Sequence, residues 1–384
     1  MRGIGAGPTD DVVVTVAGAT YQPLLELHRF DAAGNVVSVH QDTTLGYPYI
    51  SNPVIDANND VGAAFVSPFT LLRLRKIAPS GATLNDDVIP ISPPYAEQVY
   101  LDGAGADAAG NLYVDITVDA APMHEFPFTE GGHRLRLPPA GPMTEVLRPF
   151  GSYPLPGSPL PVGADGHTYS VVSLAAGTTG CPGVPLTVPA GGALRIGESD
   201  TTGACVWAKL LAVPNTTTEW MDFTVGADGS LALARWFTGT IDLGSGPLTS
   251  GASGAMAFAR FDAAGNLLWA RSFDGLTSGF ARVNATGMMA IKADYSGAVD
   301  LGAGPLPASA NTVLAAFDAA GNLRWNKAVT VDKGYIEIAM SPCALYFSTN
   351  STTVDLGSGP LSVMMGTSST GPAMNSIGIA ALAL

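Results

Sequence analysis

Short apolar runs separated by turn residues dominate this chain. Leu231–Ala234 and Met288–Ile291 are apolar at every position instead of alternating between apolar and polar. A run of roughly four to eight such residues, bounded by Gly, Pro, Asn or Asp, is typical of a strand that is covered on both faces. The pattern therefore predicts many short β-strands, each packed between neighbours.

One turn sequence recurs unchanged at three places, Phe30–Asn35, Phe261–Asn266 and Phe317–Asn322, and an apolar run follows each copy. Its Asp can accept a hydrogen bond from a backbone N–H further along the turn. Its Gly can adopt the positive φ that closes a twisted antiparallel pair. The motif therefore predicts a hairpin turn between two strands.

A second, looser turn occurs earlier in each repeat, for example at Asp56–Asp60, Asp107–Asn111 and Gly226–Gly229. Two hairpins per repeat give four strands, and seven repeats of about 55 residues fill the chain. We predict an all-β fold, a seven-bladed β-propeller of four-stranded antiparallel blades in a single domain, 1–384. The predicted blades are 1–42, 43–92, 93–152, 153–213, 214–275, 276–331 and 332–384. Separate β-sandwiches are the alternative, but each needs about 100 residues.

Three tryptophans occupy one repeated position on the predicted fourth strands, Trp207, Trp269 and Trp325. Large aromatic rings at an equivalent position in successive repeats favour packing of one blade against the next. We therefore expect a structural role for them.

The last predicted blade has sequence for three strands only. They are expected near Tyr335–Met340, Ala344–Thr349 and Ser376–Leu384, with no sequence left for a fourth. An unpaired outer edge favours association, and many propellers borrow a strand from the other terminus. Two expectations stay open: residues upstream of Met1, following an export signal, supply the missing strand, or this blade has three strands.

The segment Asp107–Val114 resembles the signature of bacterial seven-bladed β-propeller repeat proteins, in which an Asp-x-x-Gly-Asn turn precedes a Tyr-Val strand. The repeat length matches along the whole chain. The motif itself matches closely only in the fifth to seventh predicted blades and in parts of the first and third. Such proteins are largely exported or attached to the cell surface and have no assigned reaction. The resemblance therefore implies a secreted or cell-envelope protein and leaves its function open.

Acidic residues outnumber basic ones by 32 to 18, which gives a net charge of −14. A phosphate backbone or an anionic membrane surface repels such a chain, so we predict no nucleic-acid partner. No run of 18 apolar residues is present, and we expect no membrane span. We predict a monomer.

The three cysteines, Cys181, Cys205 and Cys343, are too few for a disulfide framework and lack the spacing of a metal site. Cys181 and Cys205 fall in the same predicted blade, and whether they form a disulfide stays open. Cys343 adjoins a hairpin turn and is expected to be a small buried residue. Each repeated turn offers one carboxylate where calcium needs several oxygen ligands, so we predict neither a metal nor a cofactor.

Side chains that could carry chemistry gather in the links between blades and in the loops from second to third strands. These segments share one face of a propeller, and they vary most along this chain. Aromatic rings there offer contact area, and carboxylates accept hydrogen bonds or attract cations. The predicted ligand-binding residues are Tyr49, Tyr95, Tyr100, Tyr153, Glu219, Trp220, Trp236, Tyr295 and Tyr335.

The sequence contains none of the catalytic motifs that can be recognised from one chain alone. We therefore predict a non-catalytic binding or scaffold propeller that recognises a carbohydrate, a small molecule or a protein ligand on this loop-rich face. The alternative is a propeller enzyme, a lyase, hydrolase or cyclase, with acid and base groups at the axial pocket. Its candidate catalytic residues are Glu97, Asp119, His124, Glu219 and Asp222. A structural surface protein without a small ligand is a third interpretation.

Overall fold

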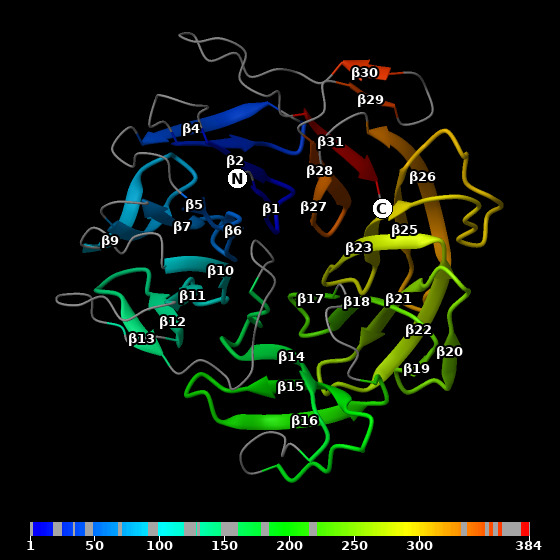
Figure 1. The fold of residues 1–384 in the computed structure, drawn as a ribbon. Helices are drawn as coiled ribbons and strands as arrows, with labels where there is room; N and C mark the ends of the chain where they lie inside the picture. Colours follow the sequence, from blue (N-terminus) through cyan, green and yellow to red (C-terminus); the bar gives the residue numbers. More distant parts are fainter. Residues whose placement is uncertain are drawn as a thin grey trace. The chain divides into compact units, whose positions relative to one another are not determined.

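The computed structural model describes most of the chain, and every regular element in the described part is a β-strand (Figure 1). The described residues are 3–17, 25–33, 35–42, 49–67, 71–90, 99–118, 128, 131–146, 160–177, 184–214, 221–331, 336–349, 353–355, 360–362 and 378–383. They divide into two compact units. The first unit holds the described residues up to Thr168 together with Thr201–Gly203, and the second holds the rest. The all-β prediction is confirmed, and the prediction of a single domain stays a prediction.

The first unit contains three antiparallel sheets whose strands follow one another in chain order. The first sheet consists of β1 (Gly3–Ala6), β2 (Val12–Ala17), β3 (Leu25–Phe30) and β4 (Val36–Asp42). The second consists of β5 (Tyr49–Ile50), β7 (Val61–Ser67), β8 (Leu71–Ile77) and β9 (Thr83–Pro90), with β6 (Val54–Ile55) also paired to β7. The third consists of β10 (Val99–Ala106), β11 (Leu112–Val118), β12 (Gly131–Leu137) and β13 (Thr144–Val146).

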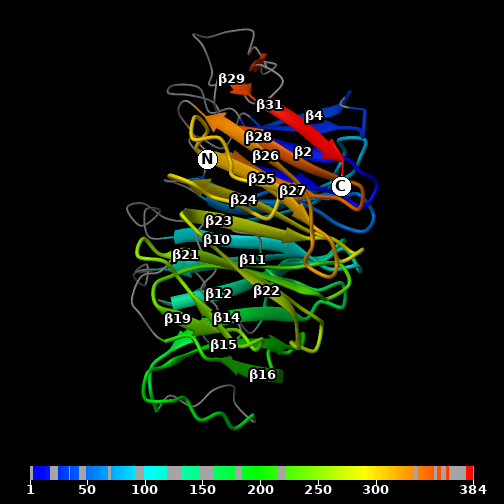
Figure 2. The same cartoon turned by 90° about the vertical axis from the view of Figure 1, so that its right-hand side faces the viewer.

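The second unit also consists of antiparallel sheets, and many of its strands are labelled in Figure 2. A three-stranded sheet consists of β14 (Thr168–Leu174), which begins at the unit boundary, β15 (Ala193–Ser199) and β16 (Cys205–Leu211). The next consists of β17 (Met221–Val225), β18 (Leu231–Phe237), β21 (Ala255–Phe261) and β22 (Leu267–Asp274). It is followed by β23 (Leu276–Val283), β24 (Met289–Tyr295), β25 (Thr312–Phe317) and β26 (Leu323–Val331). The last consists of β27 (Ile336–Met340), β28 (Ala344–Thr349) and β31 (Gly378–Ala383).

An all-β propeller fold is confirmed, with six blades recognised in the described part of the chain where the sequence predicts seven. Two sheets have three described strands, β14 to β16 in the predicted blade 153–213 and β27, β28 and β31 in the predicted blade 332–384. Three strands are predicted for the last of these and four for the other. The prediction of seven blades is wrong in the described part of the chain.

The repeated Asp-Ala-Ala-Gly-Asn segment is a hairpin turn held by its own side chains. Asp262 Oδ1 accepts a hydrogen bond from the backbone N–H of Asn266 at 2.7 Å, and Asp262 Oδ2 accepts one from the Asn266 side-chain amide at 2.8 Å. Gly265 has a φ of +71°. Asp31 and Asp318 make the same pair of bonds in their turns. The turn prediction is confirmed at all three copies.

Replacing Asp262 with Ala is expected to lower the free energy of unfolding by about 1 kcal/mol, because two hydrogen bonds of an exposed turn are lost. Asp262→Asn keeps an acceptor and should retain at least half of that stability. Urea unfolding of both variants measures the difference. Equal stability of Asp262→Ala and the wild type would show that the backbone alone closes this turn.

Both faces of the strands are covered by apolar side chains, as the sequence pattern predicts. Leu231 and Leu233 on β18 belong to one hydrophobic cluster, whereas Ala232 and Ala234 on the same strand belong to another. All four side chains are fully buried. Side chains of a strand alternate between its faces, so β18 is packed on both sides.

Short hairpins after the second strand link successive sheets of the second unit. The first is formed by β19 (Thr240–Asp242) and β20 (Pro247–Thr249), and another by β29 (Thr353–Asp355) and β30 (Pro360–Ser362). Asp242 Oδ1 accepts hydrogen bonds from the N–H groups of Gly244 and Gly246, and the Asp242 N–H donates to the Ala212 carbonyl, just beyond β16. Likewise, β29 pairs with β26 of the preceding sheet. These contacts indicate a structural role for the repeated hairpin.

Cys205 on β16 takes part in a disulfide bond. Cys181, its candidate partner, lies outside the described residues. Cys343 is a free and exposed thiol. The prediction that Cys343 is buried is wrong, because it lies in the turn between β27 and β28 and not within a strand.

Candidate functional site

Most of the predicted site residues fall in links and loops outside the described part of the chain. These are Tyr95, Glu97, Asp119, His124, Tyr153, Glu219, Trp220 and Tyr335. Tyr49 lies on β5, but its side chain is not described. The remaining four, Tyr100, Asp222, Trp236 and Tyr295, lie in three different sheets.

Asp222 on β17 is a buried acid with structural partners. Its Oδ2 accepts hydrogen bonds from the backbone N–H of Ala281 at 3.0 Å and from Arg282 Nη1 at 2.7 Å, both on β23. Thr224 on β17 donates its hydroxyl hydrogen to the Ala281 carbonyl. Two side chains of β17 therefore bind the backbone of β23 directly. These contacts give Asp222 a structural role, because they join β17 to β23. Its catalytic role stays a prediction.

Trp236 and Tyr295 are packed into the hydrophobic cluster shared by β18 and β24. Tyr295 is 5% exposed, and its hydroxyl donates a hydrogen bond to the Pro307 carbonyl at 2.8 Å. Burial raises the pKa of the Tyr295 hydroxyl. The Trp236 ring lies against Gly254, where an added Cβ would come within 2.5 Å of it. Their proposed contact with a ligand stays a prediction.

Tyr100 differs from these residues because 48% of it is exposed. Thr117 on β11 lies directly opposite, and its hydroxyl donates a hydrogen bond of 2.6 Å to Asp102 Oδ2. The strand register shifts between Leu101 and Gly103, so Asp102 is the extra residue of a β-bulge. A bulge re-aims a side chain, and here it turns the Asp102 carboxylate toward Thr117. We name Tyr100, Asp102 and Thr117 the β10 corner.

A second polar group lies on β23 and β24. Lys292 is directly opposite Phe280, and its Nζ lies 5.7 Å from the centre of the Phe280 ring. Arg282 Cζ lies 5.8 Å from the same ring centre. Lys292 Nζ also forms an ion pair of 2.6 Å with Asp294. The ring therefore carries two cations beside it, an arrangement stabilised by cation–π attraction.

Asp294 stays ionised in this group. Burial is the largest single effect and raises the pKa of its carboxyl. The Lys292 charge and the hydrogen bonds from Lys292, Ser278 and Thr312 together outweigh it, so the pKa is lowered. The Asp294 side chain is 40% exposed. It therefore presents a fixed negative charge at the surface.

Glu337 on β27 is an acid that the sequence did not single out. Burial raises the pKa of its carboxyl to about 7, although the charge of Arg282 acts in the opposite direction. Its Oε2 is buried and has no hydrogen-bond partner. A carboxyl group that titrates near neutral pH can donate or accept a proton under physiological conditions. The burial that shifts it could not be inferred from a position inside a predicted strand.

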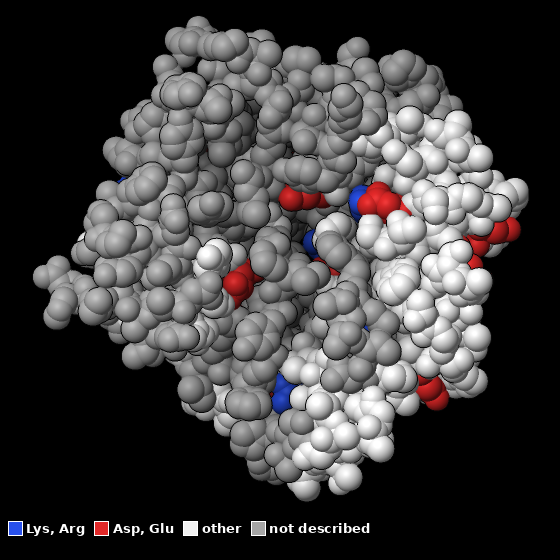
Figure 3. All heavy atoms as spheres, in the orientation of Figure 1, with Lys and Arg blue, Asp and Glu red and all other residues white. Residues whose placement is uncertain are grey.

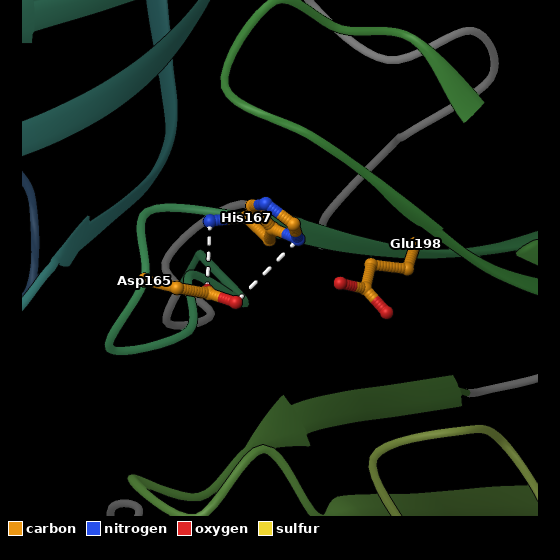
Figure 4. A group of neighbouring side chains, drawn as sticks. All are labelled: Asp165, His167 and Glu198. Carbon is orange, nitrogen blue, oxygen red and sulfur yellow. Dashed lines mark hydrogen bonds and ion pairs between the residues drawn. The ribbon is translucent and has the colours of Figure 1, made fainter. Parts of the chain in front are cut away.

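Asp165 and His167 pair within a turn of the first unit (Figure 4). The backbone N–H of His167 donates a hydrogen bond to Asp165 Oδ1 at 3.0 Å, and the ring Nδ1 lies 3.5 Å from Asp165 Oδ2. Glu198, drawn in the same figure, belongs to the second unit and accepts a hydrogen bond from the Trp207 indole N–H. That the chain holds no metal stays a prediction.

Charged side chains are scattered over the described part of the face in Figure 3, with acidic and basic groups next to one another in places. The described residues include no helix that is long and apolar enough to cross a membrane.

No family model and no characterised protein matches this sequence. Its structure is similar to the β-propeller domain of the trilobed protease from Pyrococcus furiosus, at 8% identity over 94% of this chain and 97% of that chain, with a TM-score of 0.47. A calcium-binding protein, regucalcin, from Agrobacterium tumefaciens is 14% identical over 76% and 80%, with a TM-score of 0.34. A post-proline cleaving enzyme from Rickettsia typhi is 9% identical over 91% and 49%, with a TM-score of 0.42. At such low identities and TM-scores we transfer no function from these proteins.

Proposed function

We propose that this chain is a binding propeller that recognises a carbohydrate through the β10 corner. The observation that carries the proposal is the exposed Tyr100 ring beside a hydroxyl and a carboxylate that are already oriented by a β-bulge. An aromatic ring packs against the apolar face of a sugar, and hydroxyl and carboxylate groups exchange hydrogen bonds with sugar hydroxyls. Few side chains need to be ordered on binding, because Asp102 and Thr117 already hold one another.

The position of the β10 corner supports the same proposal. Tyr100 lies near the start of β10 and Thr117 near the end of β11, so both lie at the end of the sheet from which the link 91–98 and the loop 119–127 emerge. These segments contain the predicted site residues Tyr95, Glu97, Asp119 and His124. Function in rigid scaffolds concentrates in such connections.

Export to the cell surface or cell envelope is part of the proposal. The disulfide bond of Cys205 supports it, because disulfides persist in oxidising compartments and are rare in the cytosol. An extracellular location would also bring the chain into contact with polysaccharides.

Replacing Tyr100 with Ala is expected to weaken carbohydrate binding at least tenfold, because the only stacking surface of the corner is lost. A glycan array identifies the ligand, and calorimetry compares the two proteins. Leu84→Ala on β9 is the matched control, since Leu84 is 47% exposed but lies on an outer strand. Equal affinity of Tyr100→Ala and the wild type would remove the assignment, and the absence of any glycan hit would remove the proposed function.

The second candidate function is an enzyme, and the observation that favours it is the Glu337 carboxyl with a pKa of about 7. Such a group would serve as a general acid or base. Assays with a panel of glycoside, uronide and ester substrates test this candidate. Turnover that falls at least tenfold in Glu337→Gln supports an enzyme. Absence of turnover by the wild-type chain on the whole panel argues against one.

A further inference from the structure

Three tryptophans stand at the same position in successive sheets of the second unit, as the third residue of β16, β22 and β26. Each lies directly opposite the penultimate residue of the strand that precedes its own in the sheet. The three opposed pairs are Trp207 with Glu198, Trp269 with Arg260, and Trp325 with Ala316. The residue opposite the tryptophan is therefore an acid, a base and an apolar residue in turn.

In the first pair the protein itself supplies the acceptor. The Glu198 carboxylate accepts a hydrogen bond from the Trp207 indole N–H. The Trp207 ring lies against Gly265 of the following turn, where an added Cβ would come within 2.5 Å of it. The ring is thus held between its own sheet and the next turn, with its polar atom satisfied.

In the second pair both partners are donors, and one N–H group of each has no acceptor. Trp269 Nε1 and Arg260 Nε are buried and have no hydrogen-bond partner. Trp269 is 8% exposed and Arg260 is 7% exposed, so water outside the protein does not reach them freely. Burying a donor without an acceptor is costly, and two adjacent unsatisfied donors require an explanation.

The remaining contacts fix the two donors in place. Arg260 Nη1 donates a hydrogen bond to the Ala319 carbonyl at 3.2 Å, and Arg260 Nη2 lies 3.6 Å from Asp228 Oδ2. Gly287 lies against the guanidinium group, and Gly321 lies against the Trp269 ring. Neither side chain can turn away to find another partner without moving the backbone of a turn.

We propose that Arg260 and Trp269 form a binding site for a small anion, a halide or a carboxylate group. Residues directly opposite one another in an antiparallel pair have Cβ atoms about 5 Å apart on the same face of the sheet, so the two side chains are neighbours. Hydrogen bonds to a charged partner are the stronger ones, and the guanidinium favours an anion over a neutral acceptor. The bound anion would accept the hydrogen bond of the Trp269 indole, as the Glu198 carboxylate accepts that of the Trp207 indole.

Titration of the full chain with chloride, and separately with formate, tests this site through the indole N–H resonances in ¹⁵N NMR. We expect a saturable shift of the Trp269 resonance with at least one of the two anions. Trp325 is the matched control, because its Nε1 is also buried without a partner but faces Ala316 instead of an arginine. No saturable shift at Trp269 would mean that water alone occupies the site and would overturn the proposal. An equal shift at Trp325 would also overturn it.

Variants separate the site from general effects of salt. Arg260→Gln removes the charge and provides a carbonyl acceptor for the indole, so the affinity for the anion should fall at least tenfold. If Arg260→Gln does not fold, Trp269→Phe keeps the ring and removes only the N–H. The rise of the urea midpoint with chloride should then be lost in Trp269→Phe and kept in Trp325→Phe. A rise that persists in Trp269→Phe would contradict the proposal.

Discussion

Replacing Asp115 with Ala is expected to lower the free energy of unfolding by about 3–5 kcal/mol, because it leaves a buried charge without its partner. Asp115 on β11 and Arg134 on β12 lie directly opposite one another, with side chains 0% and 1% exposed. Arg134 Nε donates a hydrogen bond to Asp115 Oδ1 at 2.6 Å, and Arg134 Nη2 donates one to Asp115 Oδ2 at 2.8 Å. The carboxylate therefore neutralises the guanidinium and accepts two of its hydrogen bonds.

Urea unfolding measures this loss, and the double variant Asp115→Ala with Arg134→Leu is its control. Removing both charges leaves no unpaired ion, so the double variant should be clearly more stable than Asp115→Ala alone. If Asp115→Ala loses less than about 1 kcal/mol, water reaches the guanidinium and the pair is not buried as described.

Stability is expected to fall as the pH rises from about 4.5 to about 7, and Glu337→Gln should remove most of this dependence. The pKa of the Glu337 carboxyl is about 7 in the folded chain and 4.5 as its ordinary value, so the folded state binds the proton more tightly. Below both values the carboxyl is protonated in either state, and its contribution to stability is complete. As the pH rises, the unfolded state ionises first. Across this pH range the free energy of unfolding should fall by about 3 kcal/mol.

Urea unfolding at several pH values between these limits compares the wild type with Glu337→Gln. Above pH 7 the variant should be the more stable protein, since its neutral amide carries no charge that burial penalises. Glu145→Gln is the matched control, because the Glu145 side chain is 51% exposed. The same pH dependence in Glu337→Gln and the wild type would show that Glu337 titrates as an ordinary surface acid.

The turns could be predicted from the sequence because their determinants are local. In the turn that begins at Asp262, the carboxylate bonds to Ala264 and Asn266, two and four residues away, and Gly265 supplies the positive φ. The same logic placed β28 at Ala344–Thr349 and the three tryptophans on the outer strands. Each of these features depends on residues within one hairpin.

The number of blades and the state of the site residues depend on contacts between distant parts of the chain. Asp222 pairs with Arg282, sixty positions further on, and no local signal distinguishes it from an exposed loop acid. The hydroxyl of Tyr295 is satisfied by Pro307, beyond the turn that follows β24. The sequence predicts three strands for the last repeat, but it does not show that the repeat 153–213 also forms a sheet of three described strands.

Glu337 and the pair of Arg260 and Trp269 escaped prediction for a related reason. These residues stand out because they have buried polar atoms without hydrogen-bond partners. The atoms are Glu337 Oε2, Arg260 Nε and Trp269 Nε1. Only the packing of neighbouring strands and turns reveals such a deficit. By contrast, the sequence singles out Tyr100 because it follows a variable link. Its role in binding stays a prediction, and the structure places Thr117 directly opposite it.

A crystal structure of the chain soaked with the tightest glycan from the array tests the central claim most directly. We expect a sugar ring stacked on Tyr100, with hydroxyl groups hydrogen-bonded to Asp102 and Thr117. A glycan bound at the opposite end of the strands, against the Asp-Ala-Ala-Gly-Asn turns, would contradict it.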